Sequence, residues 1–491
     1  MTSALFAFDN SYARDLSGFY VDWQGEEVPK PELMLFNSPL AQELGLSTEA
    51  LESLGVDDMA AVFAGVKSPE GASPLAQVYA GHQFGGFSPQ LGDGRALLLG
   101  EVIDRQGKRR DVQLKGSGRT PFSRGGDGKA VVGPVLREYI IGEAMHALGI
   151  PTTRALAAVT TGELVFREGP KPGAVLTRVA SSHLRIGTFQ YFAARGESDK
   201  VRQLADYAIA RHDPDLVSDT DKYLTFFRRV VERQATLVAK WVLVGFVHGV
   251  MNTDNTTISG ETIDYGPCAF IDAYDPAAVF SSIDHGGRYA FGRQPMILQW
   301  NLARLAEALL PLIDADDPDK AVELVSEELN RFPDLYRSAW LEGMRAKLGL
   351  LSDLEGDQEL SDDLLKLMAE QSVDYTQFFR ALAEAAADAV SGLFKDTSPF
   401  ESWLQTWRNR LAKENTDAVD IKQRMDAVNP VYIPRNHLVE GALSAAEVGD
   451  YEPAKKLINV LEHPFKERAG LEAYAQPAPK DFGPYQTFCG T

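Results

Sequence analysis

The sequence predicts an α+β fold, in which a small antiparallel β-lobe with one helix precedes a large, mainly helical lobe. Three observations predict this order. Residues 96–103 form an apolar run and residues 109–115 alternate between apolar and polar side chains, as two strands joined by a turn would. Residues 134–149 carry an apolar row at helical spacing, and from about residue 199 most segments have that same spacing.

The chain has 491 residues, which is more than one hydrophobic core usually supports. We therefore expect several parts. These are an N-terminal extension (1–75), a β-lobe (76–185), a helical lobe (186–470) and a C-terminal tail (471–491) that carries Cys489.

The charge balance excludes some classes of partner. The net charge is −20, so a nucleic acid or an anionic membrane surface would be repelled, and we expect neither as a partner. No stretch approaches the roughly 18 consecutive apolar residues of a membrane span, and the N-terminus lacks the pattern of a signal peptide. We expect a cytoplasmic protein and a monomer.

The β-lobe begins with a glycine-rich segment, YAGHQFGGFSPQLGDGR, that leads into the strand at 96–103. Glycines let backbone N–H groups approach phosphates, and Lys115, at the end of the next strand, would supply a positive charge behind them. Many glycine-rich loops join strands without binding a ligand. Further strands are predicted at 154–160, 163–167 and 174–180, which gives a five-stranded lobe.

A second glycine-rich and basic loop, at 116–133, precedes the helix at 134–149. Pro134 suits a first helical turn. Glu138 lies off the apolar row, so it either pairs with Lys115 or faces solvent. Arg178 and Arg185 follow in the last strand and beyond it, where they could clamp a phosphate or form ordinary ion pairs.

A long apolar helix is predicted to lead into residues 248–266, HGVMNTDNTTISGETIDYG. Asn255 and Asp264 are oxygen donors nine positions apart, and the sequence between them indicates a strand-turn-strand hairpin with both groups near one end. Such donors suit Mg²⁺ or Mn²⁺. The alternative is that both residues only form turns.

The rest of the chain is predicted to be mostly helical, and the proline-rich tail extended. The candidate helices are 295–313, 318–349, 361–371, 376–395, 399–413 and 436–462.

The loop at 248–266 resembles the catalytic and metal-binding loops of protein kinases. His248, Asn255 and Asp264-Tyr265-Gly266 take the places of the kinase His, Asn and D-F-G residues. Val250 stands where a kinase has its catalytic Asp, which argues against ordinary γ-phosphoryl transfer. Asp254 is the nearest acid that could replace it. The glycine loop, Lys115 and Glu138 precede these residues in kinase order.

Several longer motifs are similar to those of the selenoprotein O family of protein adenylyltransferases: YAGHQFGGFSPQLGDGRA, LKGSGRTPFSRGGDGKAV, HGVMNTDN, DYGP and a cysteine third from the C-terminus. This resemblance implies a protein-kinase-like, two-lobed fold that binds ATP in reversed orientation. It implies transfer of AMP to Ser, Thr or Tyr hydroxyls of proteins with release of pyrophosphate, and UMP transfer from UTP is also attributed to bacterial members.

The resemblance also implies roles for individual residues. Glu138 would position Lys115, and Asn255 and Asp264 would hold Mg²⁺ or Mn²⁺. Asp254 would accept the proton or orient the metal ion. The implied nucleotide contacts are Gly92, Gly94, Arg95, Lys115, Asp127, Gly128, Arg178 and Arg185.

The two cysteines of the chain are Cys268 and Cys489. Family members are thought to couple a C-terminal cysteine to redox state, and Cys268 lies two residues after the metal loop. We hypothesise that the two form a disulfide that ties the tail over the active-site side. Two free thiols in a reducing compartment are the alternative.

Other functional classes remain open at this point. A conventional kinase-like phosphotransferase is opposed by Val250, and a non-catalytic ATP-binding pseudokinase by the intact lysine, glutamate and metal pair. A helical scaffold would leave the order of the motifs unexplained. The sequence alone does not identify the protein substrates, or choose between AMP and UMP or between Mg²⁺ and Mn²⁺.

Overall fold

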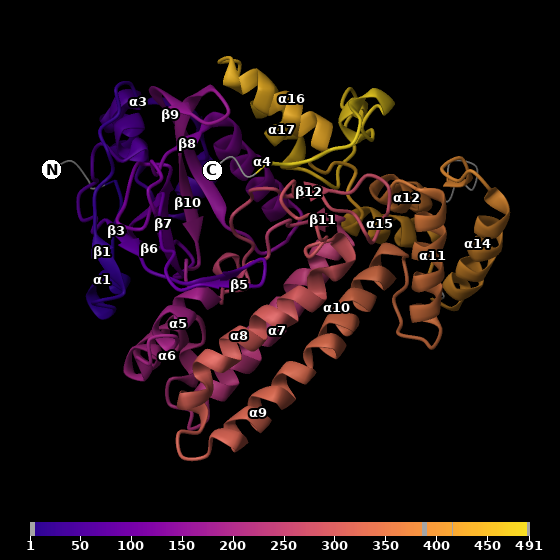
Figure 1. Ribbon diagram of the computed structural model, residues 1–491. Coiled ribbons are helices and arrows are strands. Elements are labelled where there is room, and N and C mark those ends of the chain that lie inside the picture. Colours follow the sequence, from indigo (N-terminus) through magenta and orange to yellow (C-terminus); the bar gives the residue numbers. More distant parts are fainter. Residues whose placement is uncertain (1–4, 385–389, 415, 489–491) are drawn as a thin grey trace.

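The computed structural model describes residues 5–384, 390–414 and 416–488. The predicted α+β class is confirmed, because one antiparallel sheet occupies the N-terminal part and helices dominate from residue 186 onward (Figure 1). Two two-stranded sheets of the described residues lie outside the main sheet: β4 (Gly81–Gln83) with β5 (Gly86–Ser88), and β11 (Phe246–Val247) with β12 (Ala269–Phe270).

The main sheet has the strand order β1-β3-β6-β7-β10-β9-β2, and β8 pairs separately with β10. Every pairing in it is antiparallel. The strands are β1 (Tyr20–Asp22), β2 (Glu32–Phe36), β3 (Leu75–Gln77), β6 (Ala96–Ile103), β7 (Arg109–Lys115), β8 (Ala130–Val131), β9 (Arg154–Phe166) and β10 (Pro170–Ala180).

Both faces of the sheet are buried, each against its own hydrophobic core. Leu97 and Leu99 point into the core under helix α3 (Thr48–Ala64), whereas Leu98 points into the larger core that includes α4 (Val132–Ala147). Successive side chains of a strand point to opposite faces, so the continuous leucine run fits a strand that is buried on both faces. The sheet therefore lies between α3 on one face and α4 on the other.

The N-terminal extension supplies both edge strands, β1 and β2. The β-sheet therefore has eight strands in the described residues, more than the five that were predicted. The strands predicted at 154–160 and 163–167 are a single strand, β9. Gly162 lies within this strand and accommodates a close approach of Lys30, whose Cβ would lie 2.6 Å from a Cβ at this position.

The helices follow the predicted order with local differences. Residues 318–349 form two helices because Pro333 at the start of the second cannot donate a backbone hydrogen bond to the first. Residues 436–462 are likewise divided, at Gly449. The helix predicted at 376–395 ends at Ala383, and part of that range, 385–389, lies outside the described residues. Helix α15 was not predicted.

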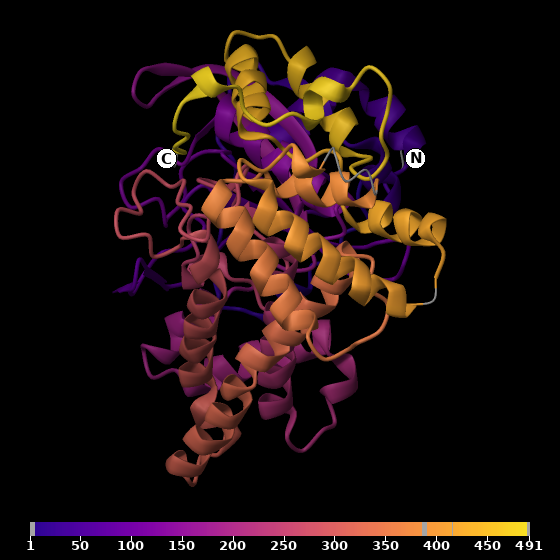
Figure 2. The same cartoon turned by 90° about the vertical axis from the view of Figure 1, so that its right-hand side faces the viewer.

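The remaining helices are α1 (Ser11–Asp15), α2 (Ser38–Glu43), α5 (Ile186–Ala193), α6 (Ser198–His212), α7 (Lys222–Leu243), α8 (Gln294–Ile313), α9 (Pro318–Asn330), α10 (Phe332–Lys347), α11 (Asp357–Gln371), α12 (Tyr375–Ala383), α14 (Thr397–Leu411), α15 (Ala418–Val428), α16 (Asn436–Glu447) and α17 (Glu452–Leu461). Short 3₁₀ turns are η1 (Pro214–Leu216), η2 (Thr253–Asn255), η3 (Phe291–Arg293), η4 (Ala412–Glu414), η5 (Glu472–Ala475) and η6 (Lys480–Phe482). Helices α16 and α17 return to pack on α4, beside the sheet (Figure 2).

Helix α7 ends at Leu243, and Gly245 follows in the left-handed conformation, with φ +76°. Strand β11 (Phe246–Val247) then pairs with β12 (Ala269–Phe270), so residues 248–268 form a loop closed at its base. The predicted hairpin between Asn255 and Asp264 is wrong. Residue 257 pairs instead with Arg185, and residue 262 with Thr152. The backbone of the loop therefore pairs with two segments that are distant in sequence.

One helical stretch among the described residues, Phe291–Ile313, is long and apolar enough to cross a membrane by composition. Half of its apolar window is buried, and α8 packs against α5, α7 and α9. Its apolar character is accounted for by this packing.

Candidate active site

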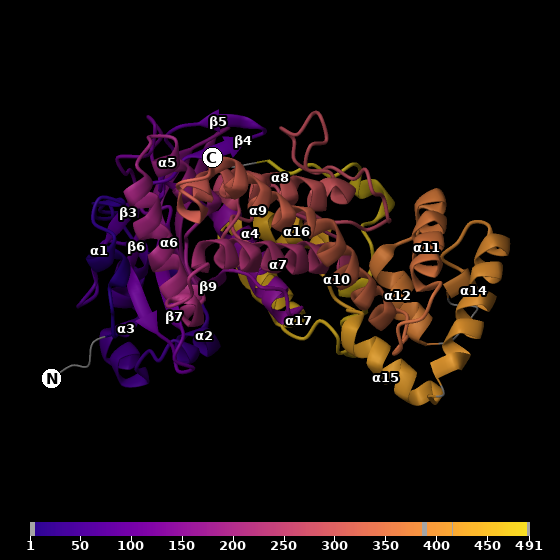
Figure 3. The same ribbon diagram turned by 90° about the horizontal axis from the view of Figure 1, so that it is seen from below.

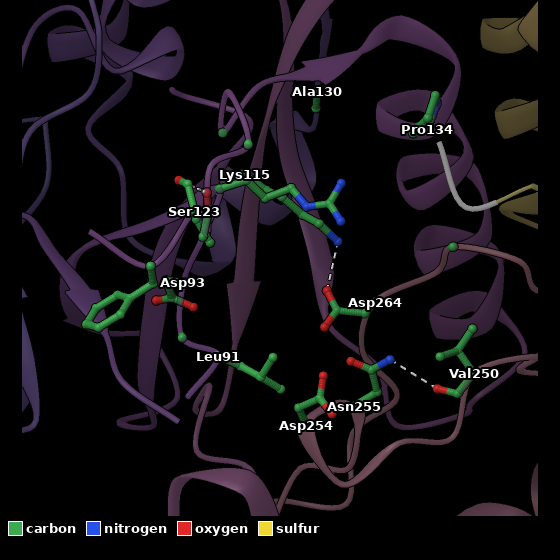
Figure 4. Close-up of a pocket in the computed structure, with 18 of the residues that line it drawn as sticks. Leu91, Asp93, Lys115, Ser123, Ala130, Pro134, Val250, Asp254, Asn255 and Asp264 are labelled. Carbon is green, nitrogen blue, oxygen red and sulfur yellow. Dashed lines mark hydrogen bonds and ion pairs between the residues drawn. The ribbon is translucent and has the colours of Figure 1, made fainter. Parts of the chain in front are cut away.

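A cavity of about 710 Å³ lies between the glycine-rich loops of the sheet and the loop at 248–268 (Figure 4). All the nucleotide, metal and catalytic residues predicted from the sequence line it. They are Gly92, Gly94, Arg95, Lys115, Asp127, Gly128, Glu138, Arg178, Arg185, Asp254, Asn255 and Asp264. The structure therefore brings into one place residues that are up to 172 positions apart.

Lys115 links the sheet, helix α4 and the loop. Its Nζ lies 2.5 Å from Oε2 of Glu138 and 2.7 Å from Oδ1 of Asp264. Glu138 is only 6% exposed, so it does not face solvent as an isolated helix glutamate would. The paired cations outweigh burial and lower the pKa of Glu138. Glu138 is therefore ionised and holds the ammonium in the cavity.

Two buried arginines complete a cationic cluster around Asp264. Nη1 of Arg178 lies 2.6 Å from Oδ1 of Asp264 and 2.9 Å from Glu138. Nη1 of Arg185 lies 2.8 Å from Oδ2 of Asp264 and donates to the backbone carbonyl of Asp254. Both arginines thus form ion pairs, but with acids of the cavity itself. Within this cluster, three cations face the two carboxylates of Glu138 and Asp264.

Asp264 is held in an unusual state. Burial would raise the pKa of its carboxyl, but Lys115, Arg178 and Arg185 outweigh burial and lower it well below the ordinary value. Its backbone has φ +61°, a conformation that non-glycine residues rarely adopt. The neighbouring carbonyl of Ile263 accepts a hydrogen bond from the ring of His248, which fixes the loop at this point.

Asp254 differs from Asp264 because no lysine or arginine of the described residues forms an ion pair with its side chain. Its Oδ2 accepts a hydrogen bond from Nε2 of Gln83, and its Oδ1 is buried with no hydrogen-bond partner among the described residues. Burial raises its pKa to about 6. A carboxyl with this pKa can accept a proton near neutral pH.

The donors near Asp254 suit a hard cation. Nδ2 of Asn255 donates to the carbonyl of Val250, which fixes the amide and leaves its Oδ1 as an acceptor beside the carboxylate of Asp264 (Figure 4). Within the described part of the chain, no group of three or more His, Cys, Asp and Glu side chains forms a metal cluster. The available oxygens are those of Asn255 and Asp264 and the unpartnered Oδ1 of Asp254. This set fits Mg²⁺ or Mn²⁺, which often keep water or phosphate as further ligands.

The glycines of the two loops are required by close packing. Gly92 has φ +99°, and a Cβ there would lie 2.6 Å from the ring of Phe122. Gly128 has φ +69° and lies against the carbonyl of Gly118. The side chain of Asp127 accepts from both terminal nitrogens of Arg167. Asp127 therefore stabilises the second loop at the cavity wall.

The model of the family described as "Protein adenylyltransferase SelO" matches residues 4–462 of this chain. The chain belongs to the SelO family. It is thus an enzyme of the nucleotidyltransferase class.

Curated relatives agree with the family match over the whole length. A Cereibacter sphaeroides protein named "Protein nucleotidyltransferase YdiU" is 62% identical over 490 residues, covering 99% of this chain and 100% of its own. Proteins of the same name from a Mycobacterium species and from Rhodopseudomonas palustris are 56% and 55% identical, each with 99% of both chains covered.

Sequence reasoning missed three polar residues of this SelO-family site. Asp93 is buried, accepts from Gln77 N and from Nε2 of Gln113, and burial raises its pKa to about 6. Oε1 of Gln113 accepts two hydrogen bonds from Arg178. The ring of Tyr79 lies 4.6 Å from the guanidinium of Arg185. Gln113 was detectable, since it lies two residues from Lys115 on the same face of β7.

The cysteine hypothesis concerns a residue outside the described part of the chain, Cys489. Cys268 is buried, and burial raises the pKa of its thiol to about 12. Thr487 lies against the residue that precedes Cys268, since its Oγ1 donates to the carbonyl of Pro267 at 2.9 Å. The pairing of the two cysteines stays a prediction.

Proposed function

We propose that this enzyme transfers AMP from ATP to Ser, Thr or Tyr hydroxyls of protein substrates and releases pyrophosphate. One observation carries the proposal: Lys115, Arg178 and Arg185 gather in the buried interior, while Asp254 keeps an unpaired carboxylate oxygen. Such an arrangement suits ATP bound in reversed orientation, with its β- and γ-phosphates on the cations and its α-phosphate facing Asp254.

We also propose a kinase-like, two-lobed arrangement for this site. The sheet with α4 forms one wall of the cavity, and the loop delivered by α7 forms the other. The ion pair between Lys115 and Glu138 has the connectivity of the kinase lysine and helix glutamate. Val250, which lines the cavity in place of a catalytic acid, argues against γ-phosphoryl transfer.

In the proposed reaction, the oxygen of the acceptor hydroxyl attacks the α-phosphorus of ATP. Asp254 accepts the hydroxyl proton, and the bond between the α-phosphorus and the bridging oxygen breaks. Pyrophosphate leaves with the bonding electron pair, and Lys115, Arg178 and Arg185 stabilise its charge. A divalent cation held by Asn255 and Asp264 would supply further neutralisation of the phosphates.

The products are the adenylylated side chain, pyrophosphate and a proton on Asp254. The same chemistry applies to UTP, which would yield a uridylylated side chain. The described residues that bind phosphate in this scheme do not distinguish the two bases, so UMP transfer remains part of the proposal.

The test is label transfer from ATP that carries the label on either the α- or the γ-phosphate, with Mg²⁺ or Mn²⁺ and a mixture of proteins. Label should reach protein from the α position only, and Asp264→Ala should abolish transfer. Label from the γ position would instead indicate a phosphotransferase. ATP binding without transfer from either position would indicate a pseudokinase. Replacing ATP with α-labelled UTP measures the UMP reaction directly.

A further inference from the structure

A small hairpin stands at the mouth of the cavity and has no role in the mechanism above. It consists of β4 (Gly81–Gln83) and β5 (Gly86–Ser88), beside α5 and the 271–290 segment (Figure 3). Gln83 and Phe84 line the cavity, and Nε2 of Gln83 lies 3.1 Å from Oδ2 of Asp254. The last residue of β4 therefore lies within hydrogen-bond distance of the proposed proton acceptor.

The turn of the hairpin is held in a strained conformation. Phe84 has φ +50° and Gly85 has φ +86°, as in the type I′ turns of tight hairpins. A phenylalanine rarely adopts this conformation. Here its N–H bonds both Oδ1 of Asn252 and the hydroxyl of Tyr289, and its ring lies 5.0 Å from the ring of Tyr289. Strain that is held by several contacts often marks a functional segment.

Despite these contacts, the hairpin leaves apolar side chains in solvent. Phe84 is 37% exposed and Phe87 41% exposed. Ile283, on the facing segment, is 50% exposed and also lines the cavity. Exposed apolar side chains that continue into a polar cavity are typical of a surface for a protein partner.

Arg288 supplies a positive charge at the tip of this hairpin. Its guanidinium carbon lies 4.8 Å from the ring of Trp300 and 3.7 Å from where a Cβ would lie on Gly85. No carboxylate of the described residues forms an ion pair with it, and its Nε has no hydrogen-bond partner there. Arg304 also lies over Trp300, but it pairs with Glu307 at 2.8 Å.

An unpaired arginine is unexpected in a chain with a net charge of −20, where most buried or half-buried arginines have a carboxylate partner. Asp284 does not serve Arg288 in this way, since its two oxygens accept the backbone N–H groups of residues 288 and 289. The guanidinium contacts Tyr289 and Trp300, but no carboxylate of the described residues neutralises its charge, so it can pair with an anionic group from outside the chain.

We propose that Phe84, Phe87, Ile283, Arg288 and Trp300 form the docking surface for the acceptor segment of a protein substrate. The segment has an acidic side chain that pairs with Arg288 and an apolar side chain that packs on the phenylalanines. This inference rests on the proposed function, for which it specifies the substrate class. Gln83, which contacts Asp254, and Gly85, which lies against Arg288, are two residues apart across the tight turn, so we place the acid about two residues from the acceptor hydroxyl.

Peptide binding tests this surface separately from catalysis. The probes are fluorescent peptides with one serine and an aspartate two residues before or after it, and otherwise identical peptides with asparagine or lysine instead. Fluorescence anisotropy with the enzyme and non-hydrolysable α,β-methylene-ATP gives the dissociation constants. The wild-type enzyme should bind one aspartate peptide about tenfold more tightly than its asparagine counterpart.

Substitutions at Arg288 should change this preference in a defined way. Arg288→Gln should abolish it, and Arg288→Glu should favour the lysine peptide. The control is Arg424→Glu, the same charge reversal at an exposed site on α15, which should keep the wild-type preference. ATP binding and the thermal unfolding midpoint show whether each variant is folded. If Arg288→Glu does not fold, the loss of the aspartate preference in Arg288→Gln is the test.

Two outcomes would overturn the inference: equal binding of all peptides by the wild-type enzyme, or an aspartate preference that survives in Arg288→Gln. Transfer from α-labelled ATP, measured in parallel on whole proteins, separates this result from the proposed function. Transfer without an Arg288-dependent preference leaves the function and removes the docking surface. An Arg288-dependent preference without transfer keeps the docking surface and removes the function.

Discussion

Gln113 of β7 and Arg178 of β10 lie directly opposite each other in the antiparallel sheet, and Oε1 of Gln113 is 2.7 Å from Nη2 of Arg178. The same oxygen accepts from Nε at 3.2 Å. The two hydrogen bonds that Arg178 donates to this one amide oxygen fix the plane of the guanidinium, so that Nη1 points to Glu138 and Asp264. The pairing register of β7 and β10 therefore determines where the Arg178 charge of the cationic cluster lies.

Gln113→Leu should destabilise the enzyme and weaken ATP binding. The substitution leaves two buried guanidinium donors without an acceptor, which costs about 1–3 kcal/mol. Denaturant unfolding and ATP titration measure the two effects. Gln405→Leu, on the exposed face of α14, is the control and should change stability by less than about 0.5 kcal/mol. Unchanged ATP affinity in Gln113→Leu would show that Arg178 does not depend on this contact.

Asp254→Asn should lower kcat by about 10²- to 10⁴-fold with little change in ATP affinity, because only proton acceptance is removed. The wild-type rate should rise with pH and reach half its maximum near pH 6, since the carboxylate form is active and burial places its pKa at about 6. The variant should lack this rise. If Asp254 instead orients the metal ion, its substitution should change the dependence on metal concentration and leave the pH profile in place.

Asp264→Asn should abolish transfer and yet strengthen the binding of ATP in the absence of metal. The substitution removes a carboxylate that Lys115, Arg178 and Arg185 now share, so these cations become more available to the phosphates. Calorimetric titration with ATP in EDTA measures this binding, and label transfer with Mn²⁺ measures the activity. Weaker metal-free binding in the variant would mean that Asp264 organises the cations rather than competing for them.

Lys347→Met should raise stability near neutral pH. Lys347 is buried in the helical core, its Nζ 4.1 Å from the ring centroid of Phe379, and burial lowers its pKa to about 7. The unfolded chain binds this proton up to its ordinary pKa, so the wild-type free energy of unfolding rises between about pH 7 and pH 10. We expect the variant to gain about 1–3 kcal/mol at pH 7, and less at pH 9.

Chemical unfolding of both proteins at pH 7 and pH 9 measures this difference. Lys366→Met, at an exposed position of α11, serves as the control because its removal should leave the pH dependence unchanged. A constant difference between wild type and Lys347→Met at the two pH values would contradict a neutral lysine in the folded state.

Much of the site could be predicted from the sequence, because the order of the motifs along the chain indicates which residues meet. Lys115, Glu138 and Asp264 meet as expected, since a strand lysine, a helix glutamate and a loop acid in this order are a recurrent combination. The hairpin between Asn255 and Asp264 was predicted wrongly for a physical reason. Its backbone groups pair with Thr152 and Arg185, which are distant in sequence, and local alternation carries no information about such partners.

The contacts of Gln83 and Arg288 were also beyond sequence analysis. Gln83 meets Asp254 across 171 positions, and Arg288 meets the hairpin tip from a segment without regular structure. Neither residue has a local pattern that marks it. Arg288 stands out only when the ion pairs of the other arginines are known.

The two edge strands have a consequence for synthesis of the protein. Strand β1 pairs with β3, and β2 with β9, although only residues 23–31 separate β1 from β2. Strand β1 can pair as soon as residue 77 is made, whereas β2 has no partner strand until residue 160 is made. Until then the nascent chain carries β2 as an unpaired strand. We therefore expect correct folding of this enzyme to require that β2 forms no pairing with another strand before β9 has been made.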